Sequence, residues 1–100
     1  MHGVVILFAY ILAHFTISYG DINYAQKLES IGNYKLALQE YLKLIDKNPK
    51  DYFSLQGAAS CYANLNELVK AGELFTKAAS IYPAGELYMN AGLSFHRAGN

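Results

Sequence analysis

The chain has 100 residues and a formal net charge of zero, because its 8 Lys and Arg balance its 8 Asp and Glu. A balanced surface argues against nucleic-acid binding, which needs clustered basic side chains to displace counterions from phosphates. The single cysteine, Cys61, excludes an intramolecular disulfide and gives no support to a zinc cluster. Cys61 lies in an apolar helical stretch, and we expect it to be buried and inert.

The first 20 residues differ from the rest of the chain. From Gly3 to Ile17 no side chain carries a fixed charge, and residues 4–13 form an apolar run. This length suits the core of a signal peptide, and Ser18 and Gly20 are small residues at the positions that a signal peptidase reads. Cleavage near Gly20 would make the mature protein secreted, periplasmic or lumenal.

Two other interpretations of this segment stay open. Residues 4–19 are long enough for a thin or tilted membrane span, which would leave the protein attached to a membrane by a single pass. They could also form a buried helix of a soluble domain. The absence of Lys and Arg before residue 20 weakens any orientation signal of the positive-inside type.

After residue 20 the sequence repeats with a period of 34. Shifting the chain by this length superimposes residues of the same class in the same order: Ala37 on Ala71, Tyr41 on Phe75 and Pro49 on Pro83. Ordered matches among small, aromatic and turn residues indicate an internal repeat.

The first half of the first period predicts an amphipathic helix that begins at Asp21, a favourable capping residue. Its apolar face carries Ala25, Leu28 and Ile31, at the spacing of one helix face. Gly32 then ends the helix, since glycine readily takes the left-handed conformation of a helix terminus.

A second amphipathic helix is predicted from Tyr34 to the residue before Pro49, where the α conformation is disfavoured. The same pattern predicts helices at residues 52–65 and 68–82. A third period opens at Leu87 and reaches the end of the chain.

These residues resemble the tetratricopeptide repeat family, in which small, aromatic and turn residues occupy set positions of a 34-residue helical hairpin. The units would be 21–50, 51–84 and an incomplete 85–100. The resemblance implies an all-α fold, an α-solenoid of about two and a half antiparallel helix-turn-helix hairpins. The residues that carry it are Ala25, Gly32, Tyr34, Ala37, Tyr41, Pro49, Leu55, Ala59, Tyr62, Ala71, Phe75, Ala78, Pro83, Tyr88, Gly92, Phe95 and Gly99.

The residue types suit such hairpins. Ala25, Ala59 and Gly92 are expected where the two helices of a hairpin approach closely. Tyr41 and Phe75 are expected to fill the space between neighbouring hairpins, because each hairpin buries its apolar face only by stacking on the next.

The resemblance also implies a binding surface, because in this family the first helix of each unit lines the concave side. Apolar and uncharged polar side chains there would suit an extended peptide or a partner helix. The main candidates are Phe53, Gln56, Ser60, Asn64, Met89, Leu93, His96 and Arg97. The same face would also carry Ile22, Gln26, Glu29, Ser30, Ala63 and Glu86.

We therefore expect an exported or membrane-tethered scaffold that binds a protein or peptide partner, with any membrane attachment through residues 4–19. His96 and Cys61 lie in different units, and the sequence has no HExxH motif or phosphate-binding glycine loop, so we expect no enzyme activity, cofactor or metal. The alternatives are a structural spacer, or a fragment of a longer array whose activity lies in a missing domain.

The third unit lacks its second helix, which would leave Leu93 and Phe95 partly uncovered. Three explanations stay open: a longer array, a partner that covers this surface, or a last helix that acts as its own polar cap.

Overall fold

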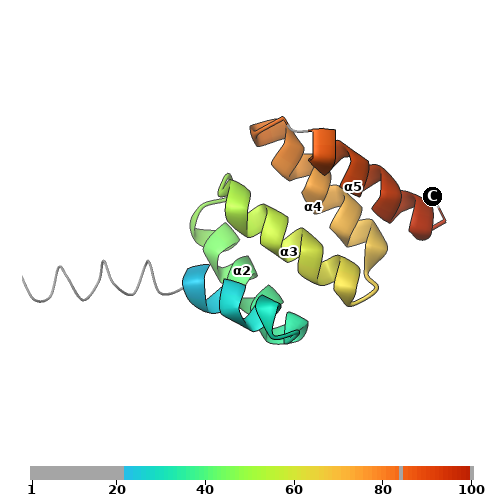
Figure 1. Ribbon diagram of the computed structural model, residues 1–100. Helices are drawn as coiled ribbons and strands as arrows, with labels where there is room; N and C mark the ends of the chain where they lie inside the picture. The colour runs from blue at the N-terminus through green and yellow to red at the C-terminus, as the bar shows by residue number, and fades with distance from the viewer. Residues whose placement is uncertain (1–21, 84, 100) are drawn as a thin grey trace, which may run out of the picture.

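The computed structural model describes residues 22–83 and 85–99, and all regular structure in these ranges is helical (Figure 1). A helical segment at 22–30 is followed by α2 (Tyr34–Lys47), α3 (Tyr52–Asn64), α4 (Leu68–Ile81) and α5 (Gly85–Arg97). The predicted leader or anchor, residues 1–20, lies outside the described residues. Within the described ranges, no helix combines the length and the apolar character that crossing a membrane requires.

The same turn recurs at the end of each first helix. Gly32 and Asn66 have positive φ angles of 83° and 64°, and Gly99 follows α5 with a φ of 85°. At the first two turns, the next residue donates its backbone N–H over 2.8 Å to the carbonyl five residues earlier. These bonds satisfy carbonyls that a helix end leaves without a partner. The 34-residue repeat of the sequence is therefore also a repeat of backbone geometry.

Each second helix ends at the residue before a proline, as predicted. Asn48 precedes Pro49 and Tyr82 precedes Pro83, and both preceding residues are extended, with φ angles of −142° and −132°. Proline disfavours the helical conformation of the residue before it, so the chain leaves the helix there.

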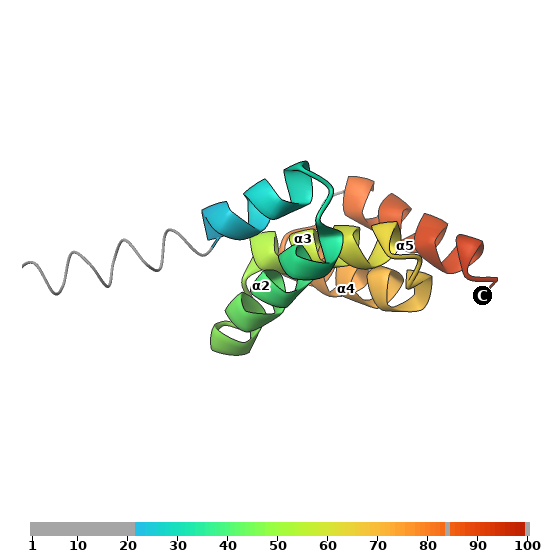
Figure 2. The ribbon, with the colours of Figure 1, turned by 90° about the horizontal axis from the view of Figure 1, so that it is seen from below.

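The helices alternate between two layers. In Figure 2, the segment 22–30, α3 and α5 lie in one layer, and α2 and α4 lie in the other. Consecutive helices pack on one another, α2 on α3, α3 on α4 and α4 on α5. The fold is therefore an all-α solenoid of antiparallel helical hairpins, as the sequence predicted.

Helix α3 is buried on two sides. Ala58 and Cys61 pack in a cluster with α2 and the segment 22–30, whereas Leu55 and Ala59 pack in a second cluster with α4 and α5. All four side chains are fully buried. A helix enclosed by neighbours on both sides needs small side chains, which explains the run of Gly, Ala, Ser and Cys in its sequence.

The predicted aromatic positions are confirmed as core residues. Tyr41 is 1% exposed and Phe75 is 6% exposed. The turn Asn33 also caps α2, where its side-chain oxygen accepts the backbone N–H of Leu36 at 3.4 Å.

Two glycines mark the closest approaches between helices. A Cβ atom on Gly57 of α3 would overlap the ring of Tyr41 from α2. A Cβ atom on Gly72 of α4 would lie 2.7 Å from the Phe95 ring of α5. A methyl group is thus too large at both positions, and the sequence pattern selected neither.

The expectation for Gly92 is wrong. Ala25 and Ala59 are fully buried as expected, but Gly92 is exposed and nothing lies within 4 Å of a Cβ atom built on it. Gly92 lies 33 residues after Ala59, on the face of α5 that corresponds to the face of α3 packed on α4. In the described chain no second helix of the third unit covers this face.

Ile31 also differs from the expectation. It was assigned to the apolar face of the first helix, yet it is 69% exposed, whereas Ala25 and Leu28 are buried. Successive helical residues are rotated by about 100°, so residue 31 lies about 120° away from residue 25. The helical segment also ends at residue 30, before the turn at Gly32.

Candidate functional site

A groove of about 300 Å³ crosses the layer formed by the segment 22–30, α3 and α5, and we call it the central groove. It brings together side chains that are far apart in the sequence. Its lining residues are Gln26, Glu29, Tyr41, Phe53, Gln56, Gly57, Ser60, Phe75 and Asn90.

The floor of the central groove is built by aromatic rings from the second layer. Tyr41 of α2 and Phe75 of α4 lie 34 residues apart and line the groove although they are almost fully buried. Gly57 allows the Tyr41 ring to pass between the first-layer helices, because it has no side chain to block it. The residues that pack the hairpins together therefore also form the base of the site.

Tyr41 is held by a hydrogen bond to the segment 22–30. Its hydroxyl donates to Oε1 of Glu29 at 2.7 Å. Burial raises the pKa of Tyr41 above its usual range, and the hydrogen bond to the Glu29 carboxylate raises it further. The phenol thus stays protonated and continues to donate, which fixes the orientation of both groups.

The rim of the groove is polar apart from one aromatic side chain. Gln26, Gln56 and Asn90 contribute amides from three different helices, and Ser60 contributes a hydroxyl. Each amide offers two donors and a carbonyl acceptor, which are the groups that pair with a peptide backbone. Phe53, at the end of α3, is 65% exposed and adds an apolar contact.

Three of the main predicted site residues therefore come together in the central groove: Phe53, Gln56 and Ser60. Gln26 and Glu29, which were expected on the same surface, also line it. The prediction identified the first-layer rim of the site but not the aromatic floor.

Other predicted residues lie outside the groove lining. Asn64 is exposed near the end of α3, and its amide donates to the backbone carbonyl of Ser60 on the same helix at 2.9 Å. Met89 and Leu93 of α5 are 66% and 54% exposed. They follow Gln56 and Ser60 by 33 residues and hold the corresponding positions on α5. His96 is exposed on the last turn of α5.

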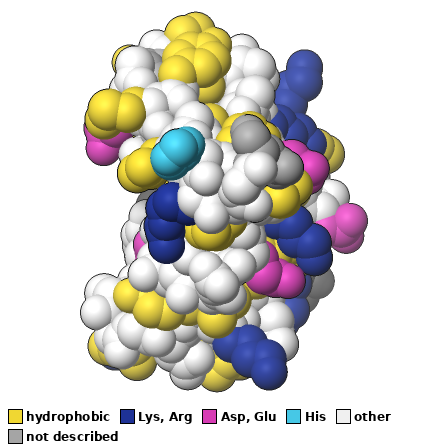
Figure 3. All heavy atoms as spheres, turned by 90° about the vertical axis from the view of Figure 1, so that its right-hand side faces the viewer, with side chains coloured by type: hydrophobic (Ala, Val, Ile, Leu, Met, Phe, Trp, Pro, Cys, Tyr) yellow, Lys and Arg dark blue, Asp and Glu magenta, His cyan; other side chains and the backbone are white. Residues whose placement is uncertain are grey.

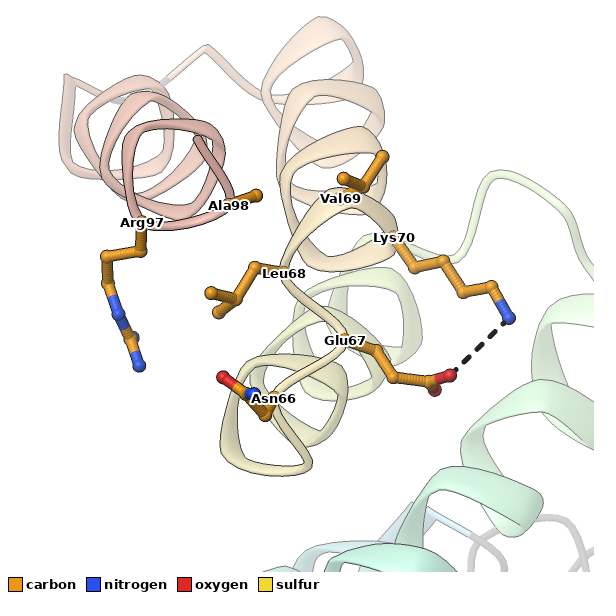
Figure 4. A pocket seen from close by; sticks show the side chains of 7 residues that line it. All are labelled: Asn66, Glu67, Leu68, Val69, Lys70, Arg97 and Ala98. Carbon is orange, nitrogen blue, oxygen red and sulfur yellow. Dashed lines mark ion pairs between the residues drawn. The ribbon is translucent and has the colours of Figure 1, made fainter. Parts of the chain in front are cut away.

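Arg97 lines a different hollow, of about 490 Å³, between the turn that joins α3 to α4 and the end of α5 (Figure 4). In Figure 4, Arg97 and Asn66 lie on opposite sides of Leu68. Glu67 and Lys70 form an ion pair at 3.7 Å on the same turn. The structure therefore separates Arg97 from the residues of the central groove.

Next to the central groove lies an aromatic hollow of about 540 Å³, lined by Tyr52, Phe53, Ile81 and Tyr82. The Tyr52 ring meets the rings of Phe53 and Tyr82 edge to face, with centroid distances of 5.2 and 5.4 Å. Phe53 lines both sites, so the apolar surface continues from the groove into this hollow.

The surface seen from the α5 side carries charges of both signs, with hydrophobic side chains exposed between them (Figure 3). Leu93 is 54% exposed, which agrees with the expected lack of cover over the third unit. Phe95 is half-buried because its ring packs on Gly72.

Cys61 is fully buried, as predicted. Burial, together with the negative charge of Glu29, raises the pKa of its thiol to about 12. Since only the thiolate reacts, we predict that a thiol reagent at about pH 8 leaves the native protein unlabelled and labels one cysteine after unfolding in urea. Rapid labelling of the native protein would contradict this placement.

The same pKa shift predicts an alkaline loss of stability. The raised pKa favours the protonated thiol in the folded state, so its contribution is complete below the unfolded pKa of about 8.5 and is lost as the pH rises toward about 12. Unfolding curves of Cys61→Ala should therefore show a shallower decline over this pH window than those of the wild type.

Sequence reasoning missed two features of the site. Asn90 lies 33 residues after Gly57 and takes its place on α5, where it lines the groove together with Phe75. The offset of 33 residues could have identified it. The bond between Tyr41 and Glu29 joins residues 12 positions apart, and no pattern in the sequence indicates it.

Among the residues that the structure describes, no group of three or more His, Cys, Asp or Glu is placed to hold a metal ion. No protein-family model matches the sequence, and a comparison with curated proteins finds no match. The function is therefore argued from the geometry of the central groove.

Proposed function

We propose that this chain is a tetratricopeptide-type scaffold that binds an extended segment of another protein in its central groove. The observation that carries the proposal is the rim of amides from three helices around a fixed aromatic floor. Such a rim can exchange hydrogen bonds with a peptide backbone, while the exposed Phe53 offers an apolar anchor.

The fixed floor favours binding because it limits the entropy that is lost when a ligand is ordered. The Tyr41 hydroxyl is bonded to Glu29, and the ring is enclosed by Gly57. A preorganised site loses less conformational freedom on binding than a mobile one, so more of the contact energy appears as affinity.

The proposal includes the apolar N-terminal segment, which we assign as an export signal or a membrane anchor that places residues 22–99 outside the cytoplasm or at a membrane. The role we propose is binding, without catalysis. The rival function is a structural spacer, in which the exposed side chains of the groove would bind nothing.

The test is a selection of peptides from a random library, displayed within a coat-protein loop, on the full 100-residue chain. We predict that Phe53→Ala weakens the selected peptides about tenfold or more, as truncation of an aromatic anchor does. Tyr24→Ala is the matched control, because Tyr24 is a 50% exposed aromatic residue outside the groove lining. Fluorescence anisotropy measures both affinities.

A selection that enriches no peptide would favour the spacer function. Equal binding by the Phe53→Ala and Tyr24→Ala variants would show that the peptides bind elsewhere. Circular dichroism of both variants checks that the fold is retained.

A further inference from the structure

The central groove has an uneven charge. Of its nine lining residues, Glu29 is the one that carries a formal charge at neutral pH. Its carboxylate is half-buried, and the Tyr41 hydroxyl occupies its Oε1 atom at 2.7 Å. The second carboxylate oxygen stays available to a ligand.

Other acidic side chains of the described chain have cationic neighbours. Glu40 pairs with Lys43 at 3.1 Å, and Glu67 pairs with Lys70 at 3.7 Å. Within residues 22–83 and 85–99, no lysine or arginine forms an ion pair with Glu29. The negative charge in the groove is therefore not neutralised by the described part of the protein.

Building on the proposed function, we infer that the central groove selects extended peptides that carry a lysine or arginine whose cationic group pairs with Glu29. The amides of Gln26 and Gln56 would bond to the peptide backbone beside it. Partial burial makes such a pair stronger than an exposed surface ion pair, because less water screens the charges.

The charge of Glu29 also acts on its surroundings. It contributes to the raised pKa values of both Tyr41 and Cys61, two buried groups of the groove floor and the core behind it. A ligand cation placed in the groove would meet the same field, with an attractive sign.

The test uses the peptides selected on the full chain, made with lysine or with the uncharged isostere norleucine at each basic position. We predict that one basic position is shared by the peptides and that its replacement weakens binding to the wild type about tenfold, as loss of a charge-assisted hydrogen bond does. Binding to the Glu29→Gln variant should change little upon the same replacement.

Glu29→Gln keeps an oxygen that accepts the Tyr41 hydroxyl, so it removes the charge while the floor stays bonded. Glu73→Gln on α4 is the matched control, since Glu73 is exposed outside the groove lining. It should bind the lysine peptide as the wild type does, and circular dichroism verifies the fold of both variants.

Each other outcome decides between the two proposals. Peptides that depend on Phe53 but not on a basic residue, or a lysine preference that survives in Glu29→Gln, would overturn the inferred specificity and leave peptide binding intact. Peptides that do not depend on Phe53, or no selected peptide at all, would overturn both.

Discussion

Truncation of Tyr41 to alanine should lower the free energy of unfolding by about 3–5 kcal/mol, the usual cost of removing a large aromatic side chain from a core. Tyr41 is 1% exposed and packs in the cluster that joins the segment 22–30, α2 and α3. Since small domains are stable by only about 5–15 kcal/mol, this substitution should remove a large part of the total. Urea unfolding followed by circular dichroism measures the change.

Two control substitutions separate the contributions of the Tyr41 ring and hydroxyl. Tyr41→Phe keeps the ring and loses only the bond to Glu29, so it should cost about 0.5–1.5 kcal/mol. Tyr88→Ala removes an aromatic ring that is 54% exposed and should change stability by less than about 0.5 kcal/mol. A cost of Tyr41→Ala as small as that of Tyr88→Ala would show that Tyr41 does not hold the hairpins together.

Substituting alanine for glycine should have opposite effects at two helical positions. Gly57→Ala should destabilise the protein by about 1–3 kcal/mol, because the added methyl overlaps the Tyr41 ring. Gly92→Ala should stabilise it by about 0.5–1 kcal/mol, since its methyl meets open space and alanine is the better helix former. Thermal unfolding of the two variants under the same conditions tests the difference in sign.

Gly72→Ala provides an intermediate case. Its methyl would approach the Phe95 ring at 2.7 Å, but Phe95 is half-buried and its ring can move outward. We expect a loss of stability that is smaller than that of Gly57→Ala. If all three substitutions stabilised the protein alike, helix propensity alone would explain them, and close packing at Gly57 would be refuted.

Helix boundaries could be predicted because the residues that set them act locally. The positive φ angles at Gly32 and Asn66 and the extended residues before Pro49 and Pro83 follow from the conformations that these residues allow. The 34-residue period then gave the order of the hairpins, because the same local signals recur.

The packing details could not be predicted in the same way. The close contact of Gly57 with Tyr41 depends on the angle between α2 and α3, which the pattern of one helix does not contain. The pattern assigned Ile31 to the core because the i, i+3 spacing tolerates a drift that the real helix does not correct.

The candidate site was predicted in part for the same reason. Phe53, Gln56 and Ser60 belong to a single helix, so their common face follows from helical periodicity. Asn90 and the aromatic floor come from other helices, and their place in the groove depends on how the hairpins stack. Peptide binding itself remains a prediction.

The double burial of α3 determines how the array can come apart. Ala58 and Cys61 need α2 beside them, and Leu55 and Ala59 need α4, so removing either neighbour opens one flank of this helix to water. A protease nick in the loop on either side of α3 would not release a self-sufficient piece. The smallest cooperative unit of this chain is therefore centred on one shared helix rather than on a repeat.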